Sequence, residues 1–409
     1  MINFQLNTGY EFVFTGHSIN NITYVIKLFA VYGVKTDWII TYNCPQDLPI
    51  AVISSKEIRY KTDLDMLTSF TLAEYGCTFI DEEGILINLL EDVNVNAENI
   101  IVEVNVEDVC LFKGSLDIVS LNYDKGENTL ECDFKPKSYI LNNTDTVING
   151  NVNFEAININ PSNIPIKITE LIDKIYKTVN PNINVEIVTD FSFLSVNNNF
   201  SPAIVTTTGI DEIFVNELLF GTYSDSNFIA NDVDNFGLAV KRLAFTLGCI
   251  TGFVDEERAV FIPFLSPNKQ VRLINENLLI NFRIEGIRDK YDCIKISNTG
   301  KYFGKYTEIQ NKYFEKDIYT TFYQNTENGL IEVSKFIIDG NIYDLDEGVL
   351  KYWSDYIMSK KYCFEYVFEL IGLDYKPNVD LNISGKRYAP SEIILDLEKY
   401  TSIIRAVKV

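Results

Sequence analysis

Apolar and polar side chains alternate along the first 60 residues, which is the pattern of strands with one face buried and one face in solvent. The strands expected there are Phe4–Thr8, Tyr10–Thr15, Thr23–Leu28 and Asp37–Tyr42. The alternation returns after residue 100, at Ile100–Val106, Val109–Phe112, Leu116–Leu121 and Thr129–Phe134. Further strands are expected between residues 270 and 340 and near the end, at Val379–Ser384, Ile393–Leu397 and Ile403–Val409. The pattern predicts an α+β fold that is rich in strand.

Helical spacing is confined to a few segments. Ile168–Val179 carries apolar residues at helical intervals and ends before Asn180-Pro181, where the proline disfavours a helical neighbour. Residues 341–370 are expected to be mainly helical, with Trp353 on their apolar stripe. We expect both tryptophans, Trp38 and Trp353, to lie in the core.

One passage occurs twice. Residues 63–89 and residues 232–264 each contain an acidic start, an amphipathic helix, a Gly-Cys step, a strand, an Asp-Glu-Glu turn and a second strand. In the first copy the helix is expected over 64–75 and the second strand over 85–90. The repetition predicts two related domains, each with a helix-plus-hairpin unit. Duplication of this kind is a usual way to build symmetric assemblies.

The length of 409 residues allows two or three domains at about 150 residues each. We expect a first β domain at 1–160 and a second, related one at 161–300. Residues 301–409 are expected to form a C-terminal strand–helix–strand region.

Charge limits the partners of the chain. The 35 Lys and Arg residues against 57 Asp and Glu give a net charge of −22 and a pI near 4.5. Nucleic-acid binding needs clustered cations, and anionic membranes repel such a chain. No apolar run approaches the roughly 18–20 residues of a membrane span, and the start shows no signal-peptide pattern. We therefore expect neither a nucleic-acid surface nor stable membrane insertion.

Candidate nucleophiles and metal ligands are few. The one histidine, His17, lies in a Gly-His-Ser stretch, which excludes multi-His metal sites and favours a turn or surface position. The seven cysteines are scattered without a CxxC pair, so neither a disulfide framework nor a zinc site is expected. Cys77 and Cys249 occupy equivalent places in the doubled passage. A paired redox role is the alternative for them, but we expect both cysteines to be small buried hydrophobic residues.

Carboxylates remain as candidates for chemistry. Asp81-Glu82-Glu83 and Asp255-Glu256-Glu257 could form acid–base pairs for glycoside hydrolysis, although their expected place at hairpin tips favours solvated turns. A cation-binding or inter-subunit role is the alternative. The segment 232–237 begins like a calcium loop, but Phe236 and Leu243 stand where ligands are required, so we expect a helix cap. We assign no catalytic, cofactor-binding or metal-binding residue and expect no enzymatic activity.

Three stretches resemble the hub and baseplate proteins of tailed bacteriophages and related contractile particles. The first is Asp232–Phe264, a helix followed by a hairpin that ends in Phe-Ile-Pro-Phe. The second is Leu111–Asp117 with Leu130–Phe134, which is similar to the "apolar-Phe-x-Gly" strand pair of tail-tip proteins. The third, from Asn382 to Val409, resembles the closing strands of minor tail proteins. Together they cover about a third of the chain.

This resemblance implies two β-barrel domains related to the tail-tube fold in one chain. It implies a homotrimer or hexamer that forms a ring at the distal end of a tail, between the tail tube and the tip or fibre proteins. DNA would be only passing cargo, and no cofactor is implied. The chain would be made in the bacterial host cytoplasm and end in the virion tail, where an acidic lumen would repel DNA.

Two other functions stay open. A carbohydrate-binding adhesin would need exposed aromatic platforms for sugars, for which the 24 tyrosines supply material. A glycan hydrolase that uses two carboxylates would need a deep acidic groove.

Overall fold

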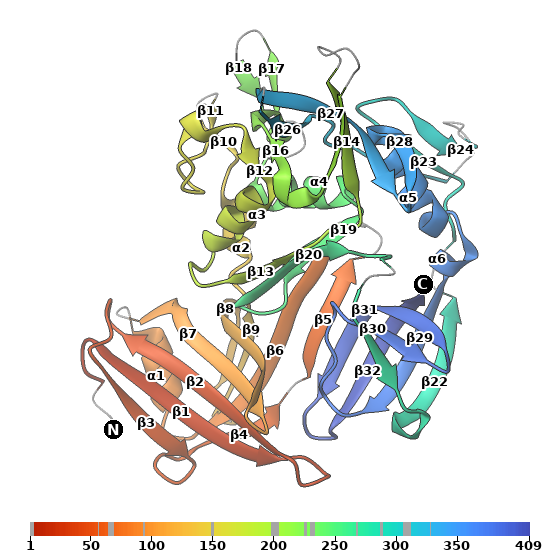
Figure 1. Cartoon of the computed structure of the whole chain (residues 1–409). Helices are drawn as coiled ribbons and strands as arrows, with labels where there is room; N and C mark the ends of the chain where they lie inside the picture. The colour runs from red at the N-terminus through yellow and green to blue at the C-terminus, as the bar shows by residue number, and fades with distance from the viewer. Residues whose placement is uncertain are drawn as a thin grey trace.

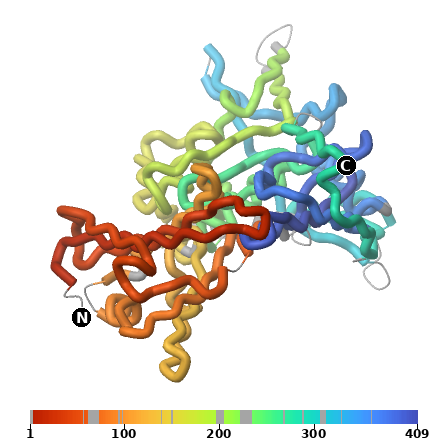
Figure 2. The backbone as a smooth tube through the Cα atoms, turned by 90° about the horizontal axis from the view of Figure 1, so that it is seen from below, coloured from red at the N-terminus to blue at the C-terminus, as the bar shows by residue number. Residues whose placement is uncertain are grey.

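The computed structural model describes residues 4–55, 57–63, 69–92, 95–148, 151–197, 204–224, 227–229, 234–266, 269–286, 289–305, 312–327 and 329–409. Strands dominate these residues and helices are few, so the predicted β-rich α+β class is confirmed (Figure 1). The two ends of the chain lie on opposite sides of the molecule in both views (Figure 2).

The N-terminal part forms one antiparallel sheet with a single parallel pair, between β1 and β3, and we call it the first sheet. Its members are β1 Thr8–His17, β2 Thr23–Tyr32, β3 Trp38–Cys44, β4 Ile50–Ser55, β6 Ser69–Asp81, β7 Val95–Val106, β8 Val109–Asp124 and β9 Thr129–Lys135. Its inward side chains alternate with outward ones, and they include Phe12, Tyr75, Phe79, Phe112 and Phe134 in the core. The short helix α1, Ile85–Glu91, packs on β6 and β7.

The C-terminal strands form a second β-rich part, which we call the last sheet. Its members are β21 Val271–Ile274, β22 Leu279–Gly286, β29 Phe364–Ile371, β30 Asp380–Ile383, β31 Lys386–Asp396 and β32 Thr401–Lys408, with the 3-10 turn η4 Glu276–Leu278.

One strand, β5 at Ile58–Asp63, joins the two sheets. It pairs antiparallel with β31 on one side and with β6 on the other. The hydrogen-bonded path therefore runs without a break as β22-β29-β32-β31-β5-β6-β9-β8-β7-β2-β1-β3. Among the described strands, β22 and β3 end this path.

The middle region lies above both sheets in Figure 1 and holds most of the helices. Its first elements are α2 Tyr139–Asn143, β10 Val147–Ile148, β11 Asn151–Val152, η1 Pro161–Asn163, β12 Ile166–Lys167, α3 Ile168–Lys177, β13 Asn184–Ile187, β14 Ser192–Asn197 and β15 Ile204–Thr208. Next come η2 Ile210–Glu212, β16 Ile213–Val215, η3 Glu217–Leu219, β17 Thr222–Ser224, β18 Asn227–Ile229, α4 Phe236–Thr246, β19 Cys249–Phe253 and β20 Arg258–Pro263. After β22 the chain adds β23 Cys293–Ile296, β24 Tyr302–Gly304, β25 Tyr313–Lys316, β26 Phe322–Thr326, β27 Gly329–Ile338, β28 Asn341–Asp344, α5 Leu345–Ile357 and α6 Lys360–Cys363.

The helix-plus-hairpin prediction is confirmed for the second copy and wrong for the first. Residues 232–264 contain α4 and the β19–β20 hairpin, with Gly248 at φ +68° where the helix ends. In the first copy residues 69–75 belong to strand β6, and residues 64–68 lie outside the described residues. The expected strand over 85–90 is helix α1. The two units therefore do not correspond, and the duplication argument that rested on them falls.

The first copy misleads because its apolar positions fit two periods. Ala73, Tyr75, Cys77 and Phe79 are all buried at intervals of two, which is strand periodicity, and the partners β9, β5 and β4 fix that choice. The run Ile85–Leu90 is apolar except at Asn88, and such a short run does not distinguish a strand from a buried helix.

Two smaller predictions are also corrected. Trp353 is fully buried and stacks on Phe245, as expected, but Trp38 is 52% exposed at the start of β3, which ends the sheet path. The expected helix over 341–370 begins only at Leu345, because Asn341–Asp344 is strand β28, and it stops at Cys363, because Phe364 begins strand β29. The domain boundaries at residues 160 and 300 stay predictions.

Candidate functional site

A row of charged side chains crosses the outward face of the sheet from β22 to β8. We call it the charge row, and it consists of Arg283 and Glu285 on β22, Glu365 on β29, Arg405 on β32, Glu392 on β31, Arg59 on β5, Glu74 on β6, Lys135 on β9 and Asp117 on β8. From Glu365 on β29 to Asp117 on β8, acidic and basic groups alternate along it. The row therefore covers both sheets and crosses the strand that joins them.

Arg405 is the centre of the row in the last sheet. Its guanidinium donates to Glu285 at 2.7 Å and to Glu365 at 3.2 Å, and its Nε lies 3.1 Å from Glu392. Burial opposes the charged form of Arg405, but these carboxylates outweigh it and raise the pKa of the guanidinium. Hydrogen bonds from Arg283 and Arg405 lower the pKa of Glu285. Both shifts favour the charged forms of Arg405 and Glu285.

The row continues across the joining strand into the first sheet. Glu392 also lies 3.6 Å from Arg59, and Arg59 is opposite Glu74 in the register of β5 and β6. Lys135 then lies 3.7 Å from Glu74 and 3.1 Å from Asp117. Since each group is partly solvated, each pair is worth at most about 1 kcal/mol, and the row's importance lies in its continuity.

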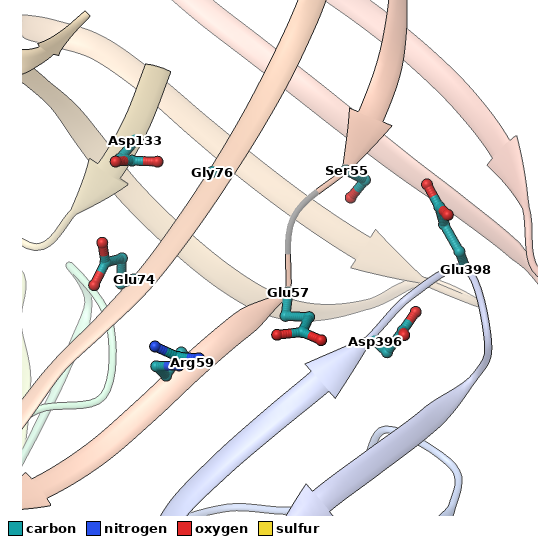
Figure 3. Close-up of a pocket in the computed structure, with 8 residues that line it drawn as sticks. All are labelled: Ser55, Glu57, Arg59, Glu74, Gly76, Asp133, Asp396 and Glu398. Carbon is teal, nitrogen blue, oxygen red and sulfur yellow. The ribbon is translucent and has the colours of Figure 1, made fainter. Parts of the chain in front are cut away.

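An acidic cavity of about 380 Å³ opens beside the row where the two sheets meet (Figure 3). It is lined by Ser55, Glu57, Arg59, Glu74, Gly76, Asp133, Asp396 and Glu398. Five carboxylates thus face one guanidinium, and the row and cavity together hold nine carboxylates and four cations. Lys399 reaches Asp396 from the adjoining turn, with its Nζ at 2.6 Å. No cluster suited to a metal ion occurs in the described part of the chain.

The edge strand β22 exposes apolar side chains on the face opposite the row. Ile280, Phe282 and Ile284 are 45–53% exposed, although Phe282 stacks on Phe368, which is buried. The far end of the sheet path, β3, exposes Trp38 and Ile39. Both ends of the path therefore present apolar surface beside backbone groups that can take a further strand.

The second Asp-Glu-Glu turn docks on the first sheet. The Glu256 carboxylate accepts a hydrogen bond from the Ser115 hydroxyl, and its backbone N–H donates to the carbonyl of Lys113 at 3.1 Å. Glu257 forms an ion pair with Lys113. Asp255 is 2% exposed and accepts from Arg258, whose Nε lies at 2.7 Å. The expectation of a solvated turn is therefore wrong for Asp255 and Glu256.

The first Asp-Glu-Glu turn has another structure. Glu82 and Glu83 are exposed as expected, but Asp81 is fully buried. Its two carboxylate oxygens accept from the N–H groups of Ile85 and Ile87, at 2.7 and 3.0 Å. Asp81 therefore caps helix α1, and the two triplets lie on different elements.

The other residues considered for chemistry are a surface histidine, two buried cysteines and a helix-capping segment. His17 is a surface residue whose Nδ1 lies 3.3 Å from the Thr23 hydroxyl. Cys77 and Cys249 are both buried, and burial raises the pKa of the Cys249 thiol. The calcium-like segment is a helix cap in which Asn235, rather than Asp232, accepts from the Leu238 N–H. Asp232 itself lies outside the described residues.

Sequence reasoning missed the charge row completely. Its nine members are spread over eight strands, and only the strand order places them in line. The alternation within a strand does indicate that a charged side chain faces away from the core. It does not indicate which strands are neighbours in the sheet.

Comparison with known proteins gives a consistent set of structures. No family model and no curated sequence matches the chain. The 43 kDa tail protein of prophage MuSo2 from Shewanella oneidensis is similar over 88% of this chain and 96% of its own, at 11% identity and a TM-score of 0.45. A tail protein from Neisseria meningitidis shows the same coverage at 8% identity and a TM-score of 0.44. An E. coli type VI secretion component, described as similar to bacteriophage T4 tail proteins, covers 88% of this chain and 76% of its own, at 6% and 0.42.

Proposed function

We propose that the chain is a structural hub or baseplate component of a phage-like tail, where copies of it form a ring that joins the tail tube to tip or fibre proteins. The observation that carries the proposal is the unbroken sheet, which ends at two different apolar edges. A neighbouring chain at each end would cover the apolar side chains and pair the free backbone groups of that edge strand.

Exposed edge strands with apolar side chains are an aggregation hazard unless they are covered. A contact between the β22 edge of one copy and the β3 end of the next covers both edges at once. Since the two surfaces differ, the contact is head-to-tail, and such contacts close into rings when the rotation fits. A homotrimer or hexamer is the expected product.

The charge row and the acidic cavity suit the lumen of this ring. Their carboxylates outnumber their cations by nine to four, so the surface as a whole is acidic. An acidic lining repels the phosphate backbone and lets DNA pass as cargo without binding. The tail tube and the tip or fibre proteins would then contact the two rims of the ring.

The oligomeric state tests the proposal. Light scattering after size-exclusion chromatography should give three or six times the chain mass of 46.8 kDa. Phe282→Arg, at the β22 edge, should shift the population to monomer. Ile342→Arg is the matched control, because Ile342 is also exposed on an edge strand but lies in the middle region. A wild-type chain that stays monomeric at micromolar concentration overturns the proposal.

A reconstruction of the ring tests the lumen. We expect the row residues Arg405, Arg59 and Lys135 to face the axis with their carboxylate partners. A lumen formed by another surface, or one with a basic lining, overturns this part and leaves the ring itself intact.

The acidic cavity keeps a glycan hydrolase as the alternative, because five carboxylates in one cavity are the feature that such an enzyme needs. Release of reducing sugar from cell-wall or capsular glycans, lost in Glu74→Gln, would favour the enzyme. A monomer without such activity that binds sugars through the exposed Tyr302, Phe303 and Tyr313 would favour an adhesin.

A further inference from the structure

Two cysteines face each other across neighbouring strands of the first sheet. Cys77 of β6 is directly opposite Cys132 of β9 in the antiparallel register. Both side chains point into the core, where they are 0% and 3% exposed. In the registers of the described strands, this is the one place where cysteine pairs with cysteine.

The register brings the two sulfurs to one face at a spacing that suits a bond. Directly opposed residues of antiparallel strands have Cα atoms about 4.5–5.5 Å apart, and disulfides span about 4.4–6.8 Å. The pairs on either side fix this register, since Tyr75 is opposite Phe134 and Phe79 is opposite Leu130, and all four of these side chains are buried. A slip of one residue would turn this whole apolar set outward.

We propose that Cys77 and Cys132 are an oxidation site and that a two-electron oxidant converts them to a cross-strand disulfide between β6 and β9. Two S–H bonds break and one S–S bond forms, and two protons and two electrons pass to the oxidant. With hydrogen peroxide the products are the disulfide and two water molecules. With diamide the N=N bond takes up both hydrogens and becomes a hydrazine.

The position gives this bond a structural effect. β6 pairs with β5 through its first half and with β4 and β9 through its second half, so it is the strand of the first sheet that meets the joining strand. A bond from Cys77 to Cys132 closes a loop that contains α1, β7 and β8. Since a cross-link mainly restricts the unfolded chain, the oxidised first sheet is harder to unfold. The inference does not depend on the ring.

The experiment uses the full chain, refolded from denaturant in a glutathione redox buffer and also oxidised in the native state with diamide. Remaining thiols are alkylated, and the peptides are analysed by mass spectrometry. We expect a linked Cys77–Cys132 peptide as the main product of refolding, and a thermal midpoint about 5 °C higher in the oxidised than in the reduced protein. Cys132→Ser should remove both effects.

Cys249→Ser is the matched control, because Cys249 is equally buried but is opposite Pro263. This variant should keep the linked peptide and the shift. Recovery of both thiols in alkylated form after oxidative refolding overturns the proposal. So does a linked peptide set in which this pair is no more abundant than other cysteine pairs.

Discussion

The two Asp-Glu-Glu triplets have the same letters and different structures. At 81–83 the triplet precedes a helix, and at 255–257 it forms the tip of a hairpin. The residue that follows makes the difference. Gly84 adopts φ +65° and leads into α1, whereas Arg258 pairs with Asp255 and continues as β20.

The comparison shows what each position of the triplet is for. The aspartate is buried in both copies, and in both its two carboxylate oxygens accept hydrogen bonds. Asp81 accepts from two backbone amides, whereas Asp255 accepts from the Glu257 N–H and from the Arg258 guanidinium. The exposure of the glutamates depends on which element lies next to the turn. Glu82 is solvated, whereas Glu256 is buried against the first sheet.

The largest expected effect is at Asp81. Asp81→Ala leaves the N–H groups of Ile85 and Ile87 without their acceptor inside the protein, and hydrogen bonds to a charged group are worth about 1.5–3 kcal/mol each. We expect a loss of about 3 kcal/mol in the free energy of unfolding, measured in urea. The neighbouring Glu82→Ala should change it by less than about 0.5 kcal/mol. Equal effects of the two would show that the cap does not stabilise α1.

The second triplet should depend on the Arg258 guanidinium, which binds one oxygen of Asp255 while the Glu257 N–H binds the other. Arg258→Met keeps an apolar stem but leaves Asp255 buried without its cation, and breaking a buried pair costs about 3–5 kcal/mol. Because the arginine is 36% exposed, we expect a smaller loss of about 2 kcal/mol. Arg283→Met, at an exposed pair of the charge row, is the control and should lose at most about 1 kcal/mol. A loss at Arg258 no larger than this control would contradict the stabilising role of the Asp255–Arg258 pair.

The contribution of Glu256, the middle residue of the second triplet, to the free energy of unfolding should depend on pH. Burial raises the pKa of Glu256 above 4.5, with the Ser115 hydroxyl opposing it. The folded chain therefore holds this proton more tightly than the unfolded chain, so the stabilisation is full below pH 4.5 and is lost as pH rises through the folded pKa. Glu256→Gln should gain on wild type over that rise by on the order of 1 kcal/mol, followed by urea unfolding from pH 4 to pH 8. A constant difference between the two proteins would refute the assignment.

The smallest effect is expected at the last glutamate. Glu257 pairs with Lys113, but the two side chains are 55% and 26% exposed, so the pair is solvated. Glu257→Gln should cost less than about 0.5 kcal/mol, and added salt should reduce even that. A salt-independent loss above about 1 kcal/mol would mean that the Glu257–Lys113 ion pair is the main contact that holds this turn on the first sheet.

Strand periodicity predicted the β-rich class and most strands of the first sheet, because alternation reports directly on which face is buried. It failed at residues 69–75, where the apolar positions suit both periods and the neighbouring strands decided the outcome. It also failed at Trp38, since the pattern says that a side chain is apolar and not that its strand ends the sheet.

The candidate site could be predicted from the sequence less well than the fold. Arg405 and Glu285 are about 120 residues apart in the chain, and nothing local to either signals the other. The facing pair Cys77 and Cys132 was equally hidden, since the doubled passage pointed to Cys249 as the equivalent of Cys77. Contacts of this kind come from strand order, which the pattern of a single strand does not contain.

The pairing of the joining strand β5 also affects how the chain folds during its synthesis. Lys61 of β5 is paired with Glu392 of β31, roughly 330 residues later in the chain. A ribosome that adds about 5–20 residues per second needs tens of seconds to make that partner. During this interval one side of β5 has no neighbour, so the nascent chain offers an unsatisfied strand to any other chain nearby. Chaperone demand should therefore be highest before the last sheet emerges, and slowing translation late in the message should lower the yield of folded protein more than slowing it early.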